Sequence, residues 1–403
     1  MSKRPQDTLA QQLDGGNPRI RFQGRPRQGD RPGLPNISYS VVRTSHVLKA
    51  AGLMLALVFA LAAVPADAQR TGAAAPARVL VLGTGGTIAG QASSRAMDAY
   101  NAGKVSAADL IVAVPGIDKL AQISADQVAS IGSQDMNDEV WFDLVTRIRR
   151  VIDKKEADAV VITHGTDTME ETAFFLNTVL DTDLPIVLVG SMRPSTAIGA
   201  DGPANLYEAV KVAAAPEARG RGVLVVLNDT IHGARWVQKT STTSVQTFVS
   251  QNAAPLGYVS PAAVRFLNPA SSGKRPTLQL PEAPPLPRVE IVYSHSNMDA
   301  ATIEDAIKRG AKGIVLAGVG DGNSSKAAID ALAIAVKQGI AVVRSTHVGS
   351  GFVNRNVEVN DDQLGFAVSL DLNPQKARIL LQLLIANHII QSQEVQRAFV
   401  ATW

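Results

Sequence analysis

Short apolar segments alternate with longer segments of helical character along most of the chain after residue 76. The apolar segments end at Gly, Pro or polar residues, which predicts buried strands. They lie at Ala77–Leu82, Ala159–Thr163, Pro185–Val189, Gly222–Leu227, Val289–Tyr293, Gly313–Leu316 and Ala341–Arg344. The predicted helices lie at Asp138–Lys155, Met169–Leu180, Ala204–Ala214, Ala300–Arg309, Lys326–Lys337 and Pro374–His388. This alternation predicts an α/β fold in which crossover helices join the strands of a mostly parallel sheet.

A proline-rich segment divides this series into two parts. Residues 268–288 contain several prolines, from Pro269 to Pro287, and are expected to form a semi-rigid linker. A chain of 403 residues is also too long for one ordinary core. We therefore expect a larger N-terminal domain over residues 77–267 and a smaller C-terminal α/β domain over residues 289–403.

Local signals mark the starts of two of these helices. Asn373 and Pro374 are residue types preferred at the N-cap and at the first helical position. Glu170 and Glu171 lie in the first turn of an earlier helix, where carboxylates interact favourably with the helix dipole. Thr168 precedes that helix and is a candidate N-cap residue, with a side chain of the type that commonly caps a helix.

The charge of the chain is unevenly distributed. The net charge is +3, from 39 Lys and Arg and 36 Asp and Glu residues. Residues 1–68 contain nine of the basic and four of the acidic residues, which leaves 30 basic and 32 acidic residues in the remainder. The main part of the chain is therefore mildly acidic, and the basic N-terminus gives no argument for binding nucleic acid.

The N-terminal 68 residues resemble a targeting segment. Residues 1–40 are rich in Arg, Gly, Pro and Gln and are expected to be disordered, or to be an extension upstream of a true start near Val41. Residues 41–68 combine basic residues, an apolar run and the small-residue signal Ala66-Asp67-Ala68, which predicts a cleaved signal peptide. A membrane anchor is the alternative. Cleavage predicts a periplasmic or secreted protein with no membrane contact, and the absence of cysteine predicts no disulfides.

The first candidate for chemistry is a Gly- and Thr-rich turn after the first strand. Residues 83–90 read Gly-Thr-Gly-Gly-Thr-Ile-Ala-Gly. The carboxyl end of a strand is where ligands bind in open α/β sheets. The Thr87 hydroxyl would be a nucleophile activated by a nearby base, and glycine N–H groups would stabilise an oxyanion. The alternative is a turn that holds a phosphate, although the order of residues is neither a P-loop nor a good dinucleotide motif.

The second candidate is the turn after the strand Ala159–Thr163. Asp167 is placed to bind an ammonium group or to orient a base, with Thr166 beside it. Lys239 is a candidate partner for Asp167, although a surface lysine is the default for such a residue. His164 suggests a catalytic triad, but a histidine at a strand end is more often a hydrogen-bonded structural residue. The six histidines show no metal-ligand spacing, so we predict no metal.

Several motifs, in the same order, resemble those of the secreted type II bacterial L-asparaginases within the asparaginase/glutaminase family. The resemblance extends from about Arg78 to the C-terminus. It rests on Thr-Gly-Gly-Thr-Ile-Ala-Gly at 84–90, Gly-Ser-Gln-Asp-Met-Asn-Asp at 132–138, His-Gly-Thr-Asp-Thr-Met-Glu-Glu-Thr at 164–172, Met-Arg-Pro-Ser-Thr at 192–196, Ala-Asp-Gly-Pro at 200–203, Gly-Val-Gly-Asp-Gly-Asn at 318–323 and Leu-Asn-Pro-Gln-Lys-Ala-Arg at 372–378.

The resemblance implies a role for each matching residue. Thr87 would be the nucleophile, and Tyr100 would be the tyrosine of a mobile lid over residues 91–104. Ser133 and Gln134 would bind the α-carboxylate and neighbouring polar groups of the substrate. The remaining implied residues form two groups: Thr166, Asp167 and Lys239, which activate water or the nucleophile and orient the substrate, and Asn323 and Glu358, which reach the site from a neighbouring subunit.

The resemblance also implies the fold, the assembly and the reaction. The fold would have a flavodoxin-like sheet in the larger domain, and the assembly would be a homotetramer with shared sites. The reaction would convert L-asparagine to L-aspartate and ammonia without a cofactor, through an acyl-enzyme or by direct attack of water. A dual-specificity glutaminase-asparaginase acting on L-glutamine, a type I enzyme, an amidotransferase subunit and a non-catalytic amino-acid-binding protein are the alternatives.

Overall fold

The computed structural model describes residues 75–92, 100–270 and 275–401. The predicted N-terminal extension, the signal peptide and residues 93–99 of the expected lid lie outside these residues. Within the described ranges, no helix is both long and apolar enough to cross a membrane.

The larger sheet has the strand order β12-β11-β8-β7-β6-β5-β1-β4 among the described residues. The neighbouring strands β4, β1, β5, β6 and β7 pair in parallel. The strands β8, β11 and β12 pair antiparallel. The bounds are β1 Arg78–Gly85, β4 Gln122–Ile131, β5 Ala159–Thr163, β6 Ile186–Val189, β7 Val223–Leu227, β8 Thr230–Gly233, β11 Gly257–Val259 and β12 Val264–Phe266. The expectation of a mostly parallel sheet is confirmed.

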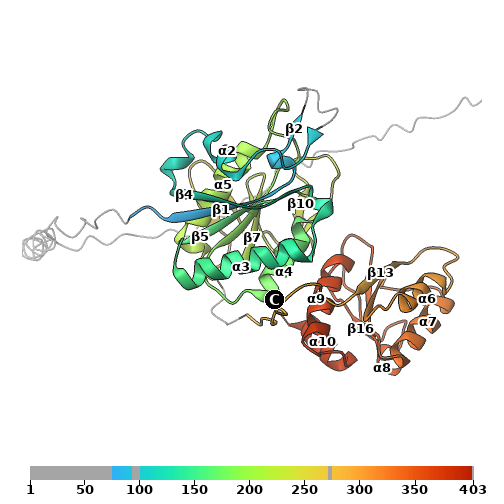
Figure 1. Cartoon of the computed structure of the whole chain (residues 1–403). Helices are drawn as coiled ribbons and strands as arrows, with labels where there is room; N and C mark the ends of the chain where they lie inside the picture. The colour runs from blue at the N-terminus through green and yellow to red at the C-terminus, as the bar shows by residue number, and fades with distance from the viewer. Residues whose placement is uncertain (1–74, 93–99, 271–274, 402–403) are drawn as a thin grey trace, which may run out of the picture. The chain divides into compact units, whose positions relative to one another are not determined.

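Helices cover both faces of this sheet, because alternate residues of each buried strand point to opposite faces. In β1, Leu80 and Leu82 pack into one core with α3 and α4, whereas Val79 and Val81 pack into another with α2 and α5. Figure 1 shows the two helix layers on either side of the strands. The bounds are α2 Ala107–Val112, α3 Asp138–Lys154, α4 Met169–Val179 and α5 Gly202–Ala214.

The C-terminal part has its own parallel sheet in the order β13-β14-β15-β16. The helices α6 and α7 pack on one face of this sheet, and α9 and α10 pack on the other. The helix bounds are α6 Ala301–Lys308, α7 Lys326–Lys337, α8 Asp361–Leu364, α9 Pro374–Ala386 and α10 Ser392–Val400, and the strand bounds are β13 Val289–Tyr293, β14 Gly313–Gly318, β15 Ala341–Thr346 and β16 Ala367–Val368. The separate smaller C-terminal α/β domain is thereby confirmed.

The helices α4 and α9 connect the two parts of the molecule. They contact each other, and one hydrophobic core continues from the larger sheet through them to the smaller sheet. The described part of the proline-rich segment also contacts α4, because the Leu278 N–H donates to the Thr178 carbonyl at 2.9 Å. The C-terminal part therefore packs directly against the helix that follows β5.

Several strands were not predicted from the pattern of residues. The edge strand β4 carries mostly exposed or half-buried side chains, so it has no apolar run of the kind that identified its neighbours. The antiparallel strands and the two short ribbons contain only two to four residues each. The ribbons pair β2 Gln91–Ala92 with β3 Tyr100–Asn101, and β9 Val237–Lys239 with β10 Phe248–Ser250. Tertiary pairing, rather than periodicity, determines such short strands.

Candidate active site

The two threonine-rich turns lie side by side at one edge of the larger sheet. The strands β1 and β5 are parallel neighbours, so their carboxyl ends meet there. The Thr84 hydroxyl donates to the Thr163 carbonyl at 2.9 Å. A Cβ atom at Gly86 would lie only 2.2 Å from the backbone of Gly165. Glycine at both positions therefore lets the turn that carries Thr87 touch the turn that carries Thr166.

Ser133 brings a third turn to this edge. It begins the short 3-10 turn Ser133–Asp135, directly after β4. Its buried hydroxyl accepts a hydrogen bond from the Asp167 N–H at 3.1 Å. Because that bond uses only a lone pair, the hydroxyl proton of Ser133 remains available for another acceptor. The adjacent Gln134 is exposed, and its amide donates to Asp135 at 3.2 Å.

The predicted capping role of Thr168 is wrong. The residue does occupy the N-cap position of α4, but its side chain accepts no hydrogen bond from the helix. Its hydroxyl instead donates to the Ser133 carbonyl at 2.7 Å. The Thr168 backbone has φ −120° and ψ 15°, which differs from the extended conformation of a typical N-cap residue. Thr168 thus connects the turn after β5 to the turn after β4.

The candidate pairing of Lys239 with Asp167 is confirmed. The Lys239 ammonium lies 2.6 Å from Oδ1 of Asp167 and donates to the Thr166 hydroxyl at 2.9 Å. The Lys239 side chain is only 18% exposed, so the default of a surface lysine is wrong. Because the Thr166 hydroxyl oxygen accepts from Lys239, its own proton can be directed toward another group.

His164 is a structural residue, as expected. It is fully buried, and its Nδ1 lies 2.7 Å from the Gly165 carbonyl, which can only accept. Nδ1 therefore carries the proton, and Nε2 accepts from the Thr172 hydroxyl at 2.9 Å. The same hydroxyl accepts from Trp141 Nε1 at 2.9 Å. Burial lowers the pKa of His164 to about 4, so the ring is neutral near pH 7.

The segment around Tyr100 returns to the first threonine turn. Tyr100 lies in β3, which pairs with β2 directly after the Thr87 turn. The Gly103 N–H donates to the Gly86 carbonyl at 3.2 Å, and the Lys104 N–H donates to the Ala89 carbonyl at 2.8 Å. The backbone at both ends of the expected lid is therefore anchored beside this turn.

Asn323 and Glu358 form a separate group in the C-terminal part. Asn323 follows β14, and its backbone pairs with Val319. Its side-chain amide donates to the exposed Glu358 carboxylate. The side-chain oxygen of Asn323 is buried and, among the described residues, has no hydrogen-bond partner. The structure thus brings these two predicted residues to each other, and it groups Thr166, Asp167, Lys239 and Ser133 at the sheet edge.

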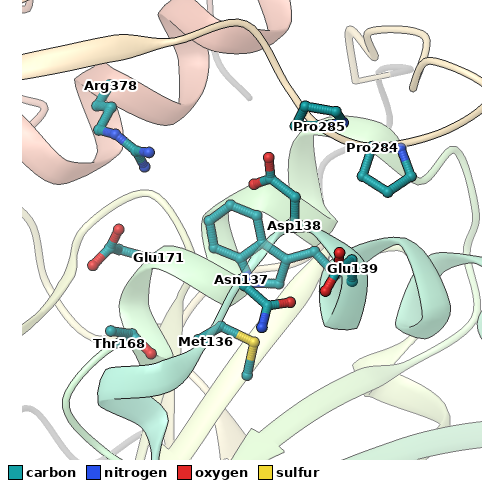
Figure 2. Close-up of a pocket in the computed structure, with 10 residues that line it drawn as sticks. Met136, Asn137, Asp138, Glu139, Thr168, Glu171, Pro284, Pro285 and Arg378 are labelled. Atoms are coloured by element: carbon teal, nitrogen blue, oxygen red, sulfur yellow. The ribbon is translucent and has the colours of Figure 1, made fainter.

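A cavity of about 540 Å³ lies beside the start of α4. Thr168, Glu171 and Arg378 contribute to its walls, and Figure 2 shows Glu171 and Arg378 on the same side of it. Glu171 also borders a second cavity of about 400 Å³ that Asp167 and Lys239 line. Burial raises the pKa of Glu171 to about 7, and the nearby Arg378 partly opposes this shift. Neither Glu171 nor Arg378 was identified from the sequence as a site residue. They lie on α4 and α9, which are far apart in the sequence, and no residue pattern indicates that these two side chains face one cavity.

Family models match both parts of the chain. The model described as Asparaginase, N-terminal, matches residues 78–272. The model described as Glutaminase/Asparaginase C-terminal domain matches residues 288–399. Together they span most of the described residues.

Curated relatives and a solved structure agree with these matches. A probable periplasmic L-asparaginase of Haemophilus influenzae is 48% identical over 76% of this chain and 87% of the relative. L-asparaginase 2 of Escherichia coli is 46% identical over 80% of this chain and 92% of that relative. A glutaminase-asparaginase of Pseudomonas fluorescens is 44% identical over 80% of this chain and 90% of that relative. The crystal structure of a probable cytoplasmic L-asparaginase from Campylobacter jejuni has a TM-score of 0.77 and 44% identity, and the match covers 81% of this chain and 100% of that one. With this agreement of sequence, fold and motif order, the chain belongs to the asparaginase family.

Proposed function

We propose that this protein hydrolyses L-asparagine to L-aspartate and ammonia, with Thr87 as the nucleophile. The observation that supports the proposal most directly is the close approach of Gly86 to Gly165, which joins the turn that carries Thr87 to the turn that carries Thr166 and Asp167. The names of the relatives support the same amide substrate.

The site offers complementary groups for a zwitterionic amino acid. The Asp167 carboxylate is 59% exposed and can receive the α-ammonium group while it stays paired with Lys239. The Ser133 hydroxyl retains a proton that it can donate to the α-carboxylate, because its oxygen only accepts from the Asp167 N–H. Gln134 is assigned to neighbouring polar groups of the substrate. These contacts would direct the side-chain amide toward the Thr87 turn.

The reaction then proceeds in two steps. The Thr87 oxygen attacks the amide carbon, and backbone N–H groups of the glycine-rich turn stabilise the oxyanion. The C–N bond breaks as the nitrogen is protonated, so ammonia leaves and an ester to Thr87 remains. Water then attacks this ester and releases aspartate, with Thr166 and Lys239 assisting the proton transfer and Tyr100 closing over the nucleophile. Direct attack of water on the amide is the alternative route.

We assign Asn323 and Glu358 to the site of a neighbouring copy. The buried Asn323 oxygen that lacks a partner within the described residues supports this assignment, since an acceptor of this kind favours a donor from outside the chain. The proposed assembly is a homotetramer in which each site is shared. We also propose export to the periplasm or the medium, carried by the signal-like residues 41–68. The H. influenzae relative is named periplasmic, whereas the C. jejuni protein is named cytoplasmic.

Ammonia release from asparagine and from glutamine, compared by kcat/KM, tests the function. We expect a preference for asparagine and a loss of at least about 1,000-fold in kcat for Thr87→Ala. Comparable rates on both amides would favour a glutaminase-asparaginase, since one methylene contributes only about 1–3 kcal/mol to discrimination. An inactive wild type that binds asparagine tightly would instead indicate a binding protein.

A further inference from the structure

The first turn of α9 contacts the strand that carries Lys239. We propose that Asn373 at the N-cap of α9 and Lys376 in its first turn, together with Glu170 in α4, are positioning residues that hold the Lys239 ammonium against Thr166. This inference rests on the function proposed above, in which Lys239 assists the reaction. It gives the C-terminal part of each chain a role in its own site, in addition to the residues that it would contribute to a neighbour.

Lys376 binds the backbone of β9 directly. Its ammonium donates to the Arg235 carbonyl at 2.9 Å and to the Val237 carbonyl, two residues before Lys239. Its side chain is buried, and burial lowers its pKa to about 8. A buried ammonium is unfavourable unless it is well hydrogen-bonded, and an apolar side chain would fill the same space without that penalty. The Lys376 ammonium therefore binds one carbonyl in β9 and one two residues before it, which ties the first turn of α9 to the segment that carries Lys239.

Glu170 connects the same strand to the first turn of α9. One of its carboxylate oxygens accepts from the Lys239 N–H at 2.6 Å, and the other accepts from the Asn373 amide at 2.7 Å. Asn373 also caps α9, because its side-chain oxygen accepts from the Lys376 N–H at 3.1 Å. Glu170 lies only three residues after Asp167 and is itself buried. The network thus fixes the spacing between the turn that carries Thr166 and the strand that carries Lys239.

This spacing matters because the Lys239 ammonium contacts two groups at once. It lies 2.9 Å from the Thr166 hydroxyl and 2.6 Å from the Asp167 carboxylate. Lys239 lies on β9, whereas both of its partners lie on the turn after β5, so a displacement of β9 relative to that turn alters both contacts together. A displacement of about 1 Å can reduce catalysis by about 100-fold.

Exchange of the two interacting groups tests the proposal. In the full-length protein, Asn373→Asp keeps an oxygen to cap α9 but turns two carboxylates toward each other. We expect kcat for asparagine to fall about 10- to 100-fold while KM changes by less than about threefold. Adding Glu170→Gln should restore kcat to within about threefold of wild type, because the amide introduced at position 170 then donates to the carboxylate introduced at position 373. Failure of this rescue, with both variants folded, would overturn the proposal.

Lys376→Met and Asn177→Ala separate positioning from general stability. Lys376→Met keeps the buried volume but removes the bonds to the Arg235 and Val237 carbonyls, and we expect the same selective loss of kcat. Asn177 is also buried on α4, but its side chain bonds to Val223 in β7, away from the site. Asn177→Ala should lower the unfolding temperature and leave kcat within about twofold of wild type at temperatures well below unfolding. An equal loss of kcat in the Asn177 variant would show that any weakening of α4 impairs the enzyme, and would contradict the specific role.

Crystal structures distinguish failure of this inference from failure of the proposed function. In the Asn373→Asp variant, the distance from Lys239 Nζ to Thr166 Oγ1 should lengthen by at least about 0.5 Å. An unchanged distance would overturn the positioning role whatever the activity. A lengthened distance together with no effect of Lys239→Met on turnover would support the positioning and contradict the proposed role of Lys239.

Discussion

Gly86 packs directly against Gly165, so that a Cβ atom on Gly86 would lie 2.2 Å from both the Gly165 nitrogen and its Cα atom. Gly86 also has a φ of 79°, in the left-handed region that favours glycine. This contact joins the turn after β1 to the turn after β5, and the geometry of the candidate site depends on it.

Gly86→Ala should separate the two turns and reduce kcat/KM by about 100-fold, because the clash is with backbone that has little freedom to move. Gly310→Ala is the matched control, since Gly310 has a φ of 81° and a Cβ atom added there would meet nothing within 4 Å. That control should lower the free energy of unfolding by about 1–2 kcal/mol through backbone strain and leave activity near wild type. Steady-state kinetics and urea unfolding measure both effects. Similar kinetics in the two variants would contradict a requirement for close contact.

Thr172→Val should destabilise the protein by about 1–3 kcal/mol, because it leaves Trp141 Nε1 and His164 Nε2 buried without partners. Thr178→Val is the control on the same helix. Thr178 is equally buried, but within the described ranges its hydroxyl bonds only to the Phe174 carbonyl one turn earlier. We expect chemical denaturation to show a clearly smaller loss for that variant. If the two losses are equal, the chain of bonds through His164 has no special contribution to stability.

Glu171→Gln should change the pH dependence of stability. The pKa of Glu171 is raised to about 7 from an ordinary value of 4.5, so the folded state binds its proton more tightly than the unfolded state does. The raised pKa therefore stabilises the folded state by up to about 3 kcal/mol below pH 4.5, and this stabilisation is lost as the pH rises through 7. The free energy of unfolding of Glu171→Gln, taken relative to wild type, should consequently be higher at pH 8 than at pH 5.

Urea unfolding of both proteins at the two pH values measures this difference. The buried His164 and His232 have pKa values lowered to about 4, so they produce the opposite trend, with stability lost as the pH falls below 6.5. They are present in both proteins and cancel in the comparison. A difference between Glu171→Gln and wild type that does not depend on pH would contradict the shifted pKa.

Mixing two inactive variants should restore activity if the sites are shared between chains. Thr87→Ala and Glu358→Ala alter different parts of each chain, so co-assembly in equal amounts should leave about one quarter of the sites intact. Co-expression followed by an ammonia assay measures this recovery. A mixture of Thr87→Ala with Lys239→Met is the control, because both changes lie in the N-terminal part and should not complement. A monomer with full activity would contradict site sharing altogether.

The sequence by itself determined the order and type of the main elements. The strand Ala159–Thr163 and the helix Lys326–Lys337 have the bounds that their patterns predict. Such elements are recognisable because burial on a sheet or on one helix face imposes a short-range period on the residues. The two threonine turns were identifiable for the same reason, since each follows a clear buried strand. The motif order also indicated the family.

Only the tertiary structure decided which residues meet. Lys239 reaches Asp167 across 72 positions of sequence, and Asn373 reaches Glu170 across 203. Glu170 looked like a carboxylate that favours the helix dipole, yet it is buried and binds the Lys239 backbone. No periodic signal encodes such contacts, because they depend on how α4, α9 and β9 pack rather than on any one segment. The pairing of short strands and the direction of the Thr168 hydroxyl depend on packing in the same way.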